Sequence, residues 1–473
     1  MAAEKCHIMM FPWLAFGHMI PFLELSKKLA AKGISISYVS TPKNLQRLPP
    51  IPLNLETKIK LLEIPMPQVD GLPENCEATI DLQLEQIQYL KTAYDKLVKP
   101  FEQLLEKVKP DLILIDFAPY WIPEIAAKFG IPTAFFSVYT AATLAYLGPP
   151  AELKTGKSRP SVEDYIRPPN WIPFPSLVAH RPDYAPRMMR NTHFPDKSGV
   201  SSGQRAAKIL EQCSFVAVRS CYEFEGEYIR LIQELYQRPV LPIGVLPPVS
   251  EERTSKSSID SRWSRTFEWL DGQKQNSVVF VGFGSEYKMP IEQIHELAFA
   301  LELCKLPFLW ILRKPQAQGV DESLDLLPLG FANRTLDQGI VLVGWAPQLE
   351  ILAHPAIGGC LFHSGWGTIV ESLGYGHPLI LLPMVADQGL NAKLLVEKEV
   401  GYEVPRNEDG SFSADMVAKS IRLVMVEPEG EKLRLNAAHM QSIFDNQESQ
   451  EHYTNSFIEY LEKYNLLKGV KEA

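Results

Sequence analysis

Short apolar segments typical of buried strands alternate with helical patterns along most of this 473-residue chain. In the N-terminal half, strands are expected at residues 7–12, 35–40, 58–64, 111–115 and 133–136. The alternation restarts after a polar segment, with strands expected at residues 278–282, 308–312, 340–344, 359–362 and 379–383. Strands that alternate with helices favour a parallel sheet covered by helices on both faces. We therefore predict an α/β fold with two Rossmann-like, doubly wound domains.

The polar run from Pro247 to Ser264 lacks periodicity and marks the expected boundary between the domains. We place the first domain at residues 1–247, a linker at 248–262, the second domain at 263–447 and a terminal segment at 448–473. This last segment carries Tyr453, Phe457 and Leu461 on one helical stripe, and such an apolar face must dock on another part of the protein. Two facing domains of one architecture indicate a ligand cleft between them.

Helical patterns in the first domain are less uniform than its strand patterns. A helix is expected from Pro21 to Ala31, which would leave His18 just before it. One long helical segment is expected from about residue 81 to residue 108. Residues 148–202 are rich in proline, arginine and aromatic residues and have little periodicity, which favours an ordered, loop-rich region facing a substrate.

The charge balance and the cysteines limit the partners and the compartment. Lysine and arginine number 47 against 56 aspartates and glutamates, a net charge of −9, which argues against a nucleic-acid partner. The six cysteines form no C-x-x-C pair, and no secretory signal precedes the first strand, so we expect a cytoplasmic protein. The uncharged run between Lys128 and Glu152 is interpreted as a buried strand and a packed helix rather than a membrane span. The default oligomeric state is a monomer.

His18 and Asp116 each follow a predicted strand of the first domain. In a doubly wound sheet the first and fourth strands are neighbours, and ligands bind at their carboxyl ends, so these two residues are expected to meet. A carboxylate behind a histidine fixes the imidazole tautomer and makes a general base for a substrate hydroxyl. The alternative is a histidine that only caps a helix, with Asp116 accepting from local backbone donors. The one G-x-S-x-G match, at residues 199–203, follows no predicted strand, so no nucleophile elbow accompanies the pair, which disfavours acyl transfer.

The second domain repeats this geometry around His363. An apolar run ends at His363, a small-residue loop (Ser364-Gly365-Trp366-Gly367-Thr368) follows, and a helical pattern then begins. Ser285 follows the first strand of this domain and is expected beside the same loop. Free backbone N–H groups at a helix start form an anion site, and a histidine there can donate a charge-assisted bond to a phosphate.

Two further side chains of this domain suit a nucleoside. Trp345 can stack on a base, and Glu371 can accept from ribose hydroxyls. The alternatives are a core aromatic for Trp345 and a solvated helix face for Glu371. The chain has no G-x-G-x-x-G, no P-loop and no D-x-D pair, so neither a nicotinamide cofactor nor a metal-bridged diphosphate is expected, and no metal or other cofactor is predicted.

The stretch from Trp345 to Gln388 (WAPQLEILAHPAIGGCLFHSGWGTIVESLGYGHPLILLPMVADQ) resembles the signature box of plant family 1 UDP-sugar-dependent glycosyltransferases. The likeness extends to a Gly-His pair after the first strand and to FGS at the opening of the second domain. This family has the GT-B fold, in which two Rossmann-like domains face each other and the last helix returns to the first domain. The resemblance implies inverting hexosyl transfer from a UDP-sugar, with His18 as the base and Asp116 as its partner.

The resemblance also implies a donor site, residue by residue. Trp345 would stack on uracil, the Ala346 backbone would bind the edge of uracil, Gln348 would lie near the nucleoside, and Glu371 would bind ribose. The diphosphate would be held by His363, Thr368 and Ser285, within a loop that also contains Trp366 and Gly367. Asp387 and Gln388 would bind sugar hydroxyls, and Thr140 is a weaker candidate for a contact with the donor sugar.

One position departs from the family pattern, because Gly367 stands where an asparagine is usual and its side-chain amide is lost. The openings MFPWLAFGHMIPFLELSKKLA and STPKNLQRLP resemble members that extend a sugar already attached to a flavonoid or terpenoid. The expected partners are therefore UDP-glucose or UDP-rhamnose and a small plant glycoside. A non-catalytic nucleotide-sugar-binding protein is the alternative, and an oxidoreductase ranks third because the dinucleotide fingerprint is absent.

Overall fold

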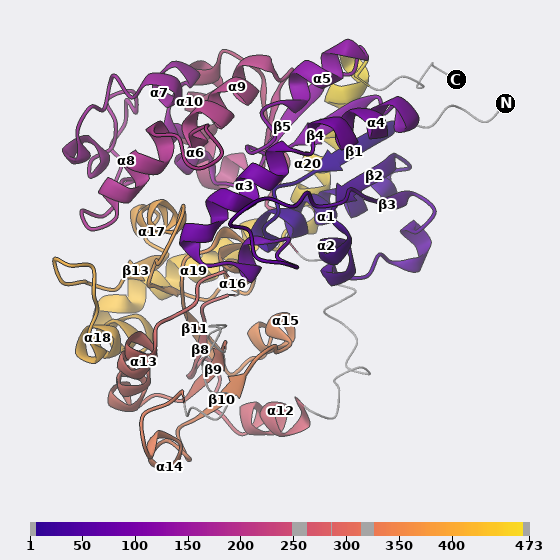
Figure 1. The fold of residues 1–473 in the computed structure, drawn as a ribbon. Helices are drawn as coiled ribbons and strands as arrows, with labels where there is room; N and C mark the ends of the chain where they lie inside the picture. The colour runs from indigo at the N-terminus through magenta and orange to yellow at the C-terminus, as the bar shows by residue number, and fades with distance from the viewer. Residues whose placement is uncertain (1–5, 248–262, 285, 314–325, 467–473) are drawn as a thin grey trace.

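The computed structural model describes residues 6–247, 263–284, 286–313 and 326–466, and the predicted linker at 248–262 lies outside them. Two parallel sheets form the centres of two lobes (Figure 1). The first sheet has the order β3-β2-β1-β4-β5-β6-β7 and the second the order β10-β9-β8-β11-β12-β13. Each sheet therefore places its first and fourth strands side by side, as predicted.

The strands of the first sheet are β1 His7–Phe11, β2 Ser35–Ser40, β3 Ile59–Glu63, β4 Leu112–Ile115, β5 Thr133–Ser137, β6 Val216–Val218 and β7 Val240–Pro242. Those of the second sheet are β8 Val278–Gly282, β9 Phe308–Leu312, β10 Gly339–Val343, β11 Ile357–Phe362, β12 Leu379–Leu381 and β13 Gly401–Glu403. The central strands are buried along their whole length, which explains their uninterrupted runs of apolar residues.

The helices of the first lobe are α1 Phe16–Ala31, α2 Pro42–Arg47, α3 Ile87–Asp95, α4 Val98–Val108, α5 Ile122–Lys128, α6 Ala141–Leu147, α7 Pro150–Thr155, α8 Ala185–His193, α9 Ser202–Gln212 and α10 Tyr222–Tyr236. Those that follow are α12 Ser264–Asp271, α13 Ile291–Cys304, α14 Phe331–Arg334, α15 Gln348–Leu352, α16 Trp366–Gly374, α17 Gln388–Glu397, α18 Ala414–Met425, α19 Glu431–Phe444 and α20 Gln447–Lys463. None of the helices in the described part of the chain combines the length and apolar character that a membrane span needs.

The C-terminal helix α20 returns to the first lobe, where its yellow ribbon lies among the indigo elements (Figure 1). Phe457 and Leu461 are fully buried in the core formed by one face of the first sheet, and the Phe457 ring lies 5.9 Å from that of Phe215. The Gln450 side-chain oxygen accepts a 2.8 Å bond from the backbone N–H of Val245. The apolar stripe expected from the sequence is thus the surface by which the chain end closes onto the first lobe, as in the GT-B fold.

Two local predictions were wrong. Helix α1 begins at Phe16 rather than Pro21, so His18 lies in its first turn; Pro21 removes one backbone donor, and the helix continues through it. The expected long helix is broken after α3, because Pro100 lacks the N–H that would bond to the carbonyl of Lys96. The region 148–202 is rich in loops, as predicted, and also contains the two short helices α7 and α8.

Candidate functional site

His18 and Asp116 meet at the carboxyl ends of the neighbouring strands β1 and β4. His18 Nδ1 lies 2.7 Å from Asp116 Oδ2, and the carboxylate is fully buried. Asp116 also accepts backbone N–H bonds from Trp13 (3.0 Å) and Phe117 (2.7 Å). These donors fix the carboxylate, so Nδ1 carries the proton that binds it and Nε2 is the ring nitrogen left with a free lone pair.

The surroundings of His18 keep it basic. Burial works to lower the pKa of His18, but attraction and hydrogen bonding to Asp116, together with the charges of Asp387 and Glu286, raise it above its ordinary value. Asp387 and Glu286 belong to the second lobe, so charges from both lobes act on one imidazole. The rings of Phe117 and Tyr139 lie 5.7 and 5.4 Å from it and limit access to the ring.

His363 ends β11 and borders the start of helix α16. The helix N-cap is Gly365, which supplies no side-chain bond to the free N–H groups of the first turn. The ring lies so close to Gly284 and Gly365 that a Cβ added to either residue would come within 2.8 or 2.6 Å of it. These two glycines therefore make room for the imidazole beside the anion site.

Burial lowers the pKa of His363 to about 4, and its Nδ1 atom, which is buried, has no hydrogen-bond partner within the described ranges. In this state the side chain is neutral at pH 7. A neutral imidazole N–H that donates to an anionic phosphate oxygen still makes a charge-assisted bond, so this role of His363 remains a prediction.

The nucleoside candidates lie close to the same edge of the second sheet. Trp345 is 64% exposed, which excludes a core role and leaves its ring face open for stacking. Gln348 Nε2 donates a 2.6 Å bond to Glu371 Oε2, so the two predicted nucleoside residues form one pair. Ala346, between these residues, is buried.

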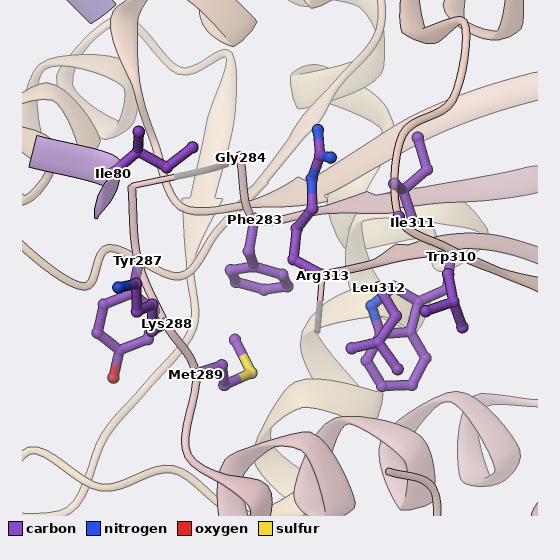
Figure 2. Close-up of a pocket in the computed structure, with 12 residues that line it drawn as sticks. Ile80, Phe283, Gly284, Tyr287, Lys288, Met289, Trp310, Ile311, Leu312 and Arg313 are labelled. Atoms are coloured by element: carbon purple, nitrogen blue, oxygen red, sulfur yellow. The ribbon is translucent and has the colours of Figure 1, made fainter. Parts of the chain in front are cut away.

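A cavity of about 300 Å³ opens at the carboxyl ends of β8, β9 and β10 (Figure 2). Phe283, Met289 and Leu312 contribute apolar walls, and Gly284 and Gly344 contribute backbone. Val343 and Gly344, the two residues that precede Trp345 in the chain, also line the cavity, so its position suits the nucleotide part of a ligand.

Asp387 and Gln388 lie at the turn between β12 and α17. Asp387 Oδ2 accepts a 2.8 Å bond from Asn391 Nδ2, and burial raises the pKa of Asp387. Gln388 is buried, and its side-chain oxygen accepts from the backbone N–H groups of Met384 and Val385, both at 2.9 Å. This oxygen shapes the turn, while Asp387 faces the same space as His18.

Of five further predicted residues, four lie within the described part of the chain. Ser285 lies outside the described residues. The Trp366 indole is buried between the lobes, donating to the Arg219 carbonyl at 2.9 Å, so only its backbone borders the anion site. Thr140 is a buried N-cap of α6 whose hydroxyl lies 3.3 Å from Asn391 Oδ1. Gly367 and Thr368 occupy the first turn of α16, and a Cβ at Gly367 would meet no atom.

Two residues near the site were missed by the sequence reasoning. Glu286 reaches from the second lobe to the first, accepting from the backbone N–H of Phe16 (3.2 Å) and from the Thr79 hydroxyl (2.6 Å). Arg313 lines the cavity, and burial, with no ion pair within the described ranges, lowers its pKa. Arg313 directly follows β9, and Glu286 comes shortly after the end of β8. Their positions after the carboxyl ends of strands were the sequence signal that could have identified them as site residues.

The described part of the chain contains no cluster of three or more histidine, cysteine, aspartate or glutamate side chains arranged to hold a metal ion. The ionisable side chains named at the site so far include His18, Asp116, Glu286, Arg313 and Asp387. His363 and the start of α16 add hydrogen-bond donors to this set.

Comparison with known proteins gives one consistent result. A sequence profile for UDP-glucoronosyl and UDP-glucosyl transferases matches residues 255–449. UDP-glycosyltransferase 91A1 of Arabidopsis thaliana is 43% identical over 97% of both chains, and soyasaponin III rhamnosyltransferase of Glycine max is 39% identical over 98% of this chain and 97% of its own. The crystal structure of Glycyrrhiza uralensis UGT73P12, complexed with glycyrrhetinic acid 3-O-monoglucuronide, has the same fold, with a TM-score of 0.79, 23% identity and coverage of 98% and 97%.

Proposed function

This chain belongs to the plant family 1 UDP-glycosyltransferases, and from that membership we propose that it is an inverting hexosyltransferase acting on a hydroxyl of a small plant metabolite. The proposed donor is UDP-glucose or UDP-rhamnose. The proposed acceptor is a flavonoid or terpenoid that already carries a sugar. The family relation supports a UDP-sugar and a small-molecule acceptor. The name of the Glycine max relative, soyasaponin III rhamnosyltransferase, supports UDP-rhamnose as the donor and a saponin-type acceptor.

The proposed chemistry begins at His18. With Nδ1–H bound to Asp116, Nε2 takes the proton from the acceptor hydroxyl while the hydroxyl oxygen attacks the anomeric carbon of the donor. The bond from that carbon to the β-phosphate oxygen breaks, and UDP leaves with the bonding electrons. The buried Asp116 stabilises the imidazolium that forms.

The second lobe would hold the donor. The free N–H groups at the start of α16, around Gly367 and Thr368, and the neutral His363 would bind the diphosphate, with Ser285 as a further ligand. Trp345 would cover uracil, and the Gln348–Glu371 pair would bind the ribose. Asp387 would bind a sugar hydroxyl beside the attacking oxygen. No metal or other cofactor is part of this proposal, and the proposed enzyme is a cytoplasmic monomer.

The observation that carries the proposal is the 2.7 Å contact between His18 and Asp116, facing Asp387 from the other lobe. A protein that only bound nucleotide sugars would have no use for a base oriented in this way. The test is UDP release from purified protein with UDP-glucose or UDP-rhamnose, each offered with flavonoid and terpenoid glycosides and with their sugar-free aglycones. Turnover that prefers aglycones would refute the acceptor proposal, and UDP binding without any turnover would favour a binding protein.

A further inference from the structure

The turn that carries Asp387 is held by a small set of backbone hydrogen bonds. Residues 382–387 connect β12 to α17, and Gln388 is the first residue of that helix. The N–H groups of Met384 and Val385 both bond to the side-chain oxygen of Gln388, at 2.9 Å. The next N–H, that of Ala386, bonds instead to the hydroxyl oxygen of Tyr184 at 2.7 Å. Two of three successive donors are thus satisfied inside the turn and the third by the other lobe.

Tyr184 comes from the region of the first lobe that was expected to face a substrate. It is the N-cap residue of α8, and its backbone N–H bonds to the Arg181 carbonyl at 3.1 Å. Arg181 itself donates a 2.9 Å bond to the Pro383 carbonyl at the start of the turn, and Asp183 holds its guanidinium through two bonds of 3.0 and 2.9 Å. Residues 181–184 of the first lobe therefore form hydrogen bonds with two positions of the turn, Pro383 and Ala386.

The backbone at Ala386 requires such support. Its φ angle is +56°, a left-handed conformation that costs a non-glycine residue energy unless its surroundings hold it. Ala386 is exposed, so its side chain has little packing to hold that conformation. The Tyr184 bond is the described contact that fixes its N–H, and Asp387 is the next residue along the chain.

We propose that Tyr184 is a positioning residue for the donor sugar: its hydroxyl holds Ala386 in the left-handed conformation and thereby sets the direction of the Asp387 carboxylate. This inference rests on the proposed function, because it takes Asp387 as a ligand of sugar hydroxyls. The proposed function places the nucleotide elsewhere, along β8, β10 and α16. Loss of the Tyr184 hydroxyl should therefore weaken recognition of the sugar and leave recognition of UDP unchanged.

The test is the Tyr184→Phe variant, which removes one oxygen and keeps the ring. Binding of UDP and of each UDP-sugar is measured by titration calorimetry, and kcat/KM is measured for UDP-glucose and UDP-rhamnose. We expect the affinity for each UDP-sugar to be weaker by about fivefold, the effect of losing one ordinary hydrogen bond, and the affinity for UDP to stay within about twofold of wild type. The ratio of kcat/KM between the two donors should become smaller. Tyr236→Phe is the matched control, since its hydroxyl bonds to the Leu144 carbonyl away from the turn.

Equal losses of affinity for UDP and UDP-sugar, or an unchanged donor ratio, would overturn the inference. A change of donor ratio in Tyr236→Phe as large as in Tyr184→Phe would overturn it as well, because the effect would then reflect general destabilisation. If wild-type protein transfers no sugar, the proposed function fails, but the comparison of UDP with UDP-sugar affinity still decides the role of Tyr184.

Discussion

His18 is the single side chain on which the proposed chemistry depends. Replacing it with alanine removes the base, so the His18→Ala variant should lose about 10²–10⁴-fold in kcat while its Kd for UDP stays near that of wild type. Asp116→Ala should cost less, because Nε2 remains and another group can orient the ring. Steady-state kinetics together with UDP calorimetry measure both effects. Near wild-type turnover in His18→Ala would show that the base is another group.

Gly367 is the position where this chain departs from the family pattern, and the space around it is open. An added Cβ meets no atom, and the residue lies in the first turn of α16, beside the proposed diphosphate site. Gly367→Asn should therefore fold and tighten UDP binding by about two- to tenfold, the range of one added hydrogen bond. Gly389→Asn is the matched control, since it also adds an unobstructed side chain at the second residue of a helix, α17. Equal gains in both variants would assign the effect to helix stability.

Helix α1 links the base to the second lobe. Glu286 accepts from the N–H of Phe16, its first residue, and its charge is among those that raise the pKa of His18. A general base acts when neutral, so kcat/KM should fall as pH drops through the His18 pKa. Glu286→Gln removes one negative charge near the His18 ring and leaves those of Asp116 and Asp387 in place. The acidic limb of the pH profile should therefore move to lower pH.

Glu397 provides the control for that shift. Its carboxylate accepts from the Tyr228 hydroxyl and from the Leu177 N–H of the first lobe, so Glu397→Gln also removes a carboxylate from a contact between the lobes, and Glu397 is not among the groups that act on the pKa of His18. The acidic limb of the pH profile of this control variant should coincide with that of the wild-type protein. An unmoved limb in Glu286→Gln would contradict the view that the Glu286 charge raises the pKa of His18.

The strands near the centre of each sheet could be predicted because they are buried and uniformly apolar, and their order follows from the doubly wound pattern. The three-residue strands β6, β7 and β13 were missed, because so few residues show no period. The start of α1 was misplaced because Pro21 was taken as a first-turn residue, whereas the helix tolerates the lost donor further along. The local residue pattern thus predicts the type of an element better than it predicts where the element begins and ends.

At the scale of the whole molecule, the meeting of His18 with Asp116 could be predicted, since both lie at strand ends whose adjacency the fold dictates. The contacts across the cleft could not. The hydrogen bonds between Glu286 and Thr79 and between Tyr184 and Ala386 join residues about 200 positions apart in the chain, and no local pattern in the sequence encodes such bonds. The position of His363 beside the start of α16 could be predicted, but its lowered pKa could not, because burial depends on the assembled site.

The return of α20 ties the end of the chain to the first lobe, and the stability of that lobe should depend on it. Phe457→Ala removes a fully buried ring from the core beside Phe215 and should lower the free energy of unfolding by about 3–5 kcal/mol. Leu435→Ala, on the exposed face of α19, is the control and should change it by less than about 0.5 kcal/mol. Denaturant unfolding followed by circular dichroism measures both.

Because the second sheet and the proposed nucleotide site make no use of Phe457, the Phe457→Ala variant should lose transfer activity at a lower denaturant concentration than it loses UDP binding. In the proposed mechanism, activity needs His18 on the first lobe, while UDP binding needs β8, β10 and α16 on the second. Activity and UDP binding that disappear together in this variant would mean that the lobes unfold as one unit, with α20 supporting both. The buried Trp366–Arg219 contact between the lobes would then be the first place to look for that coupling.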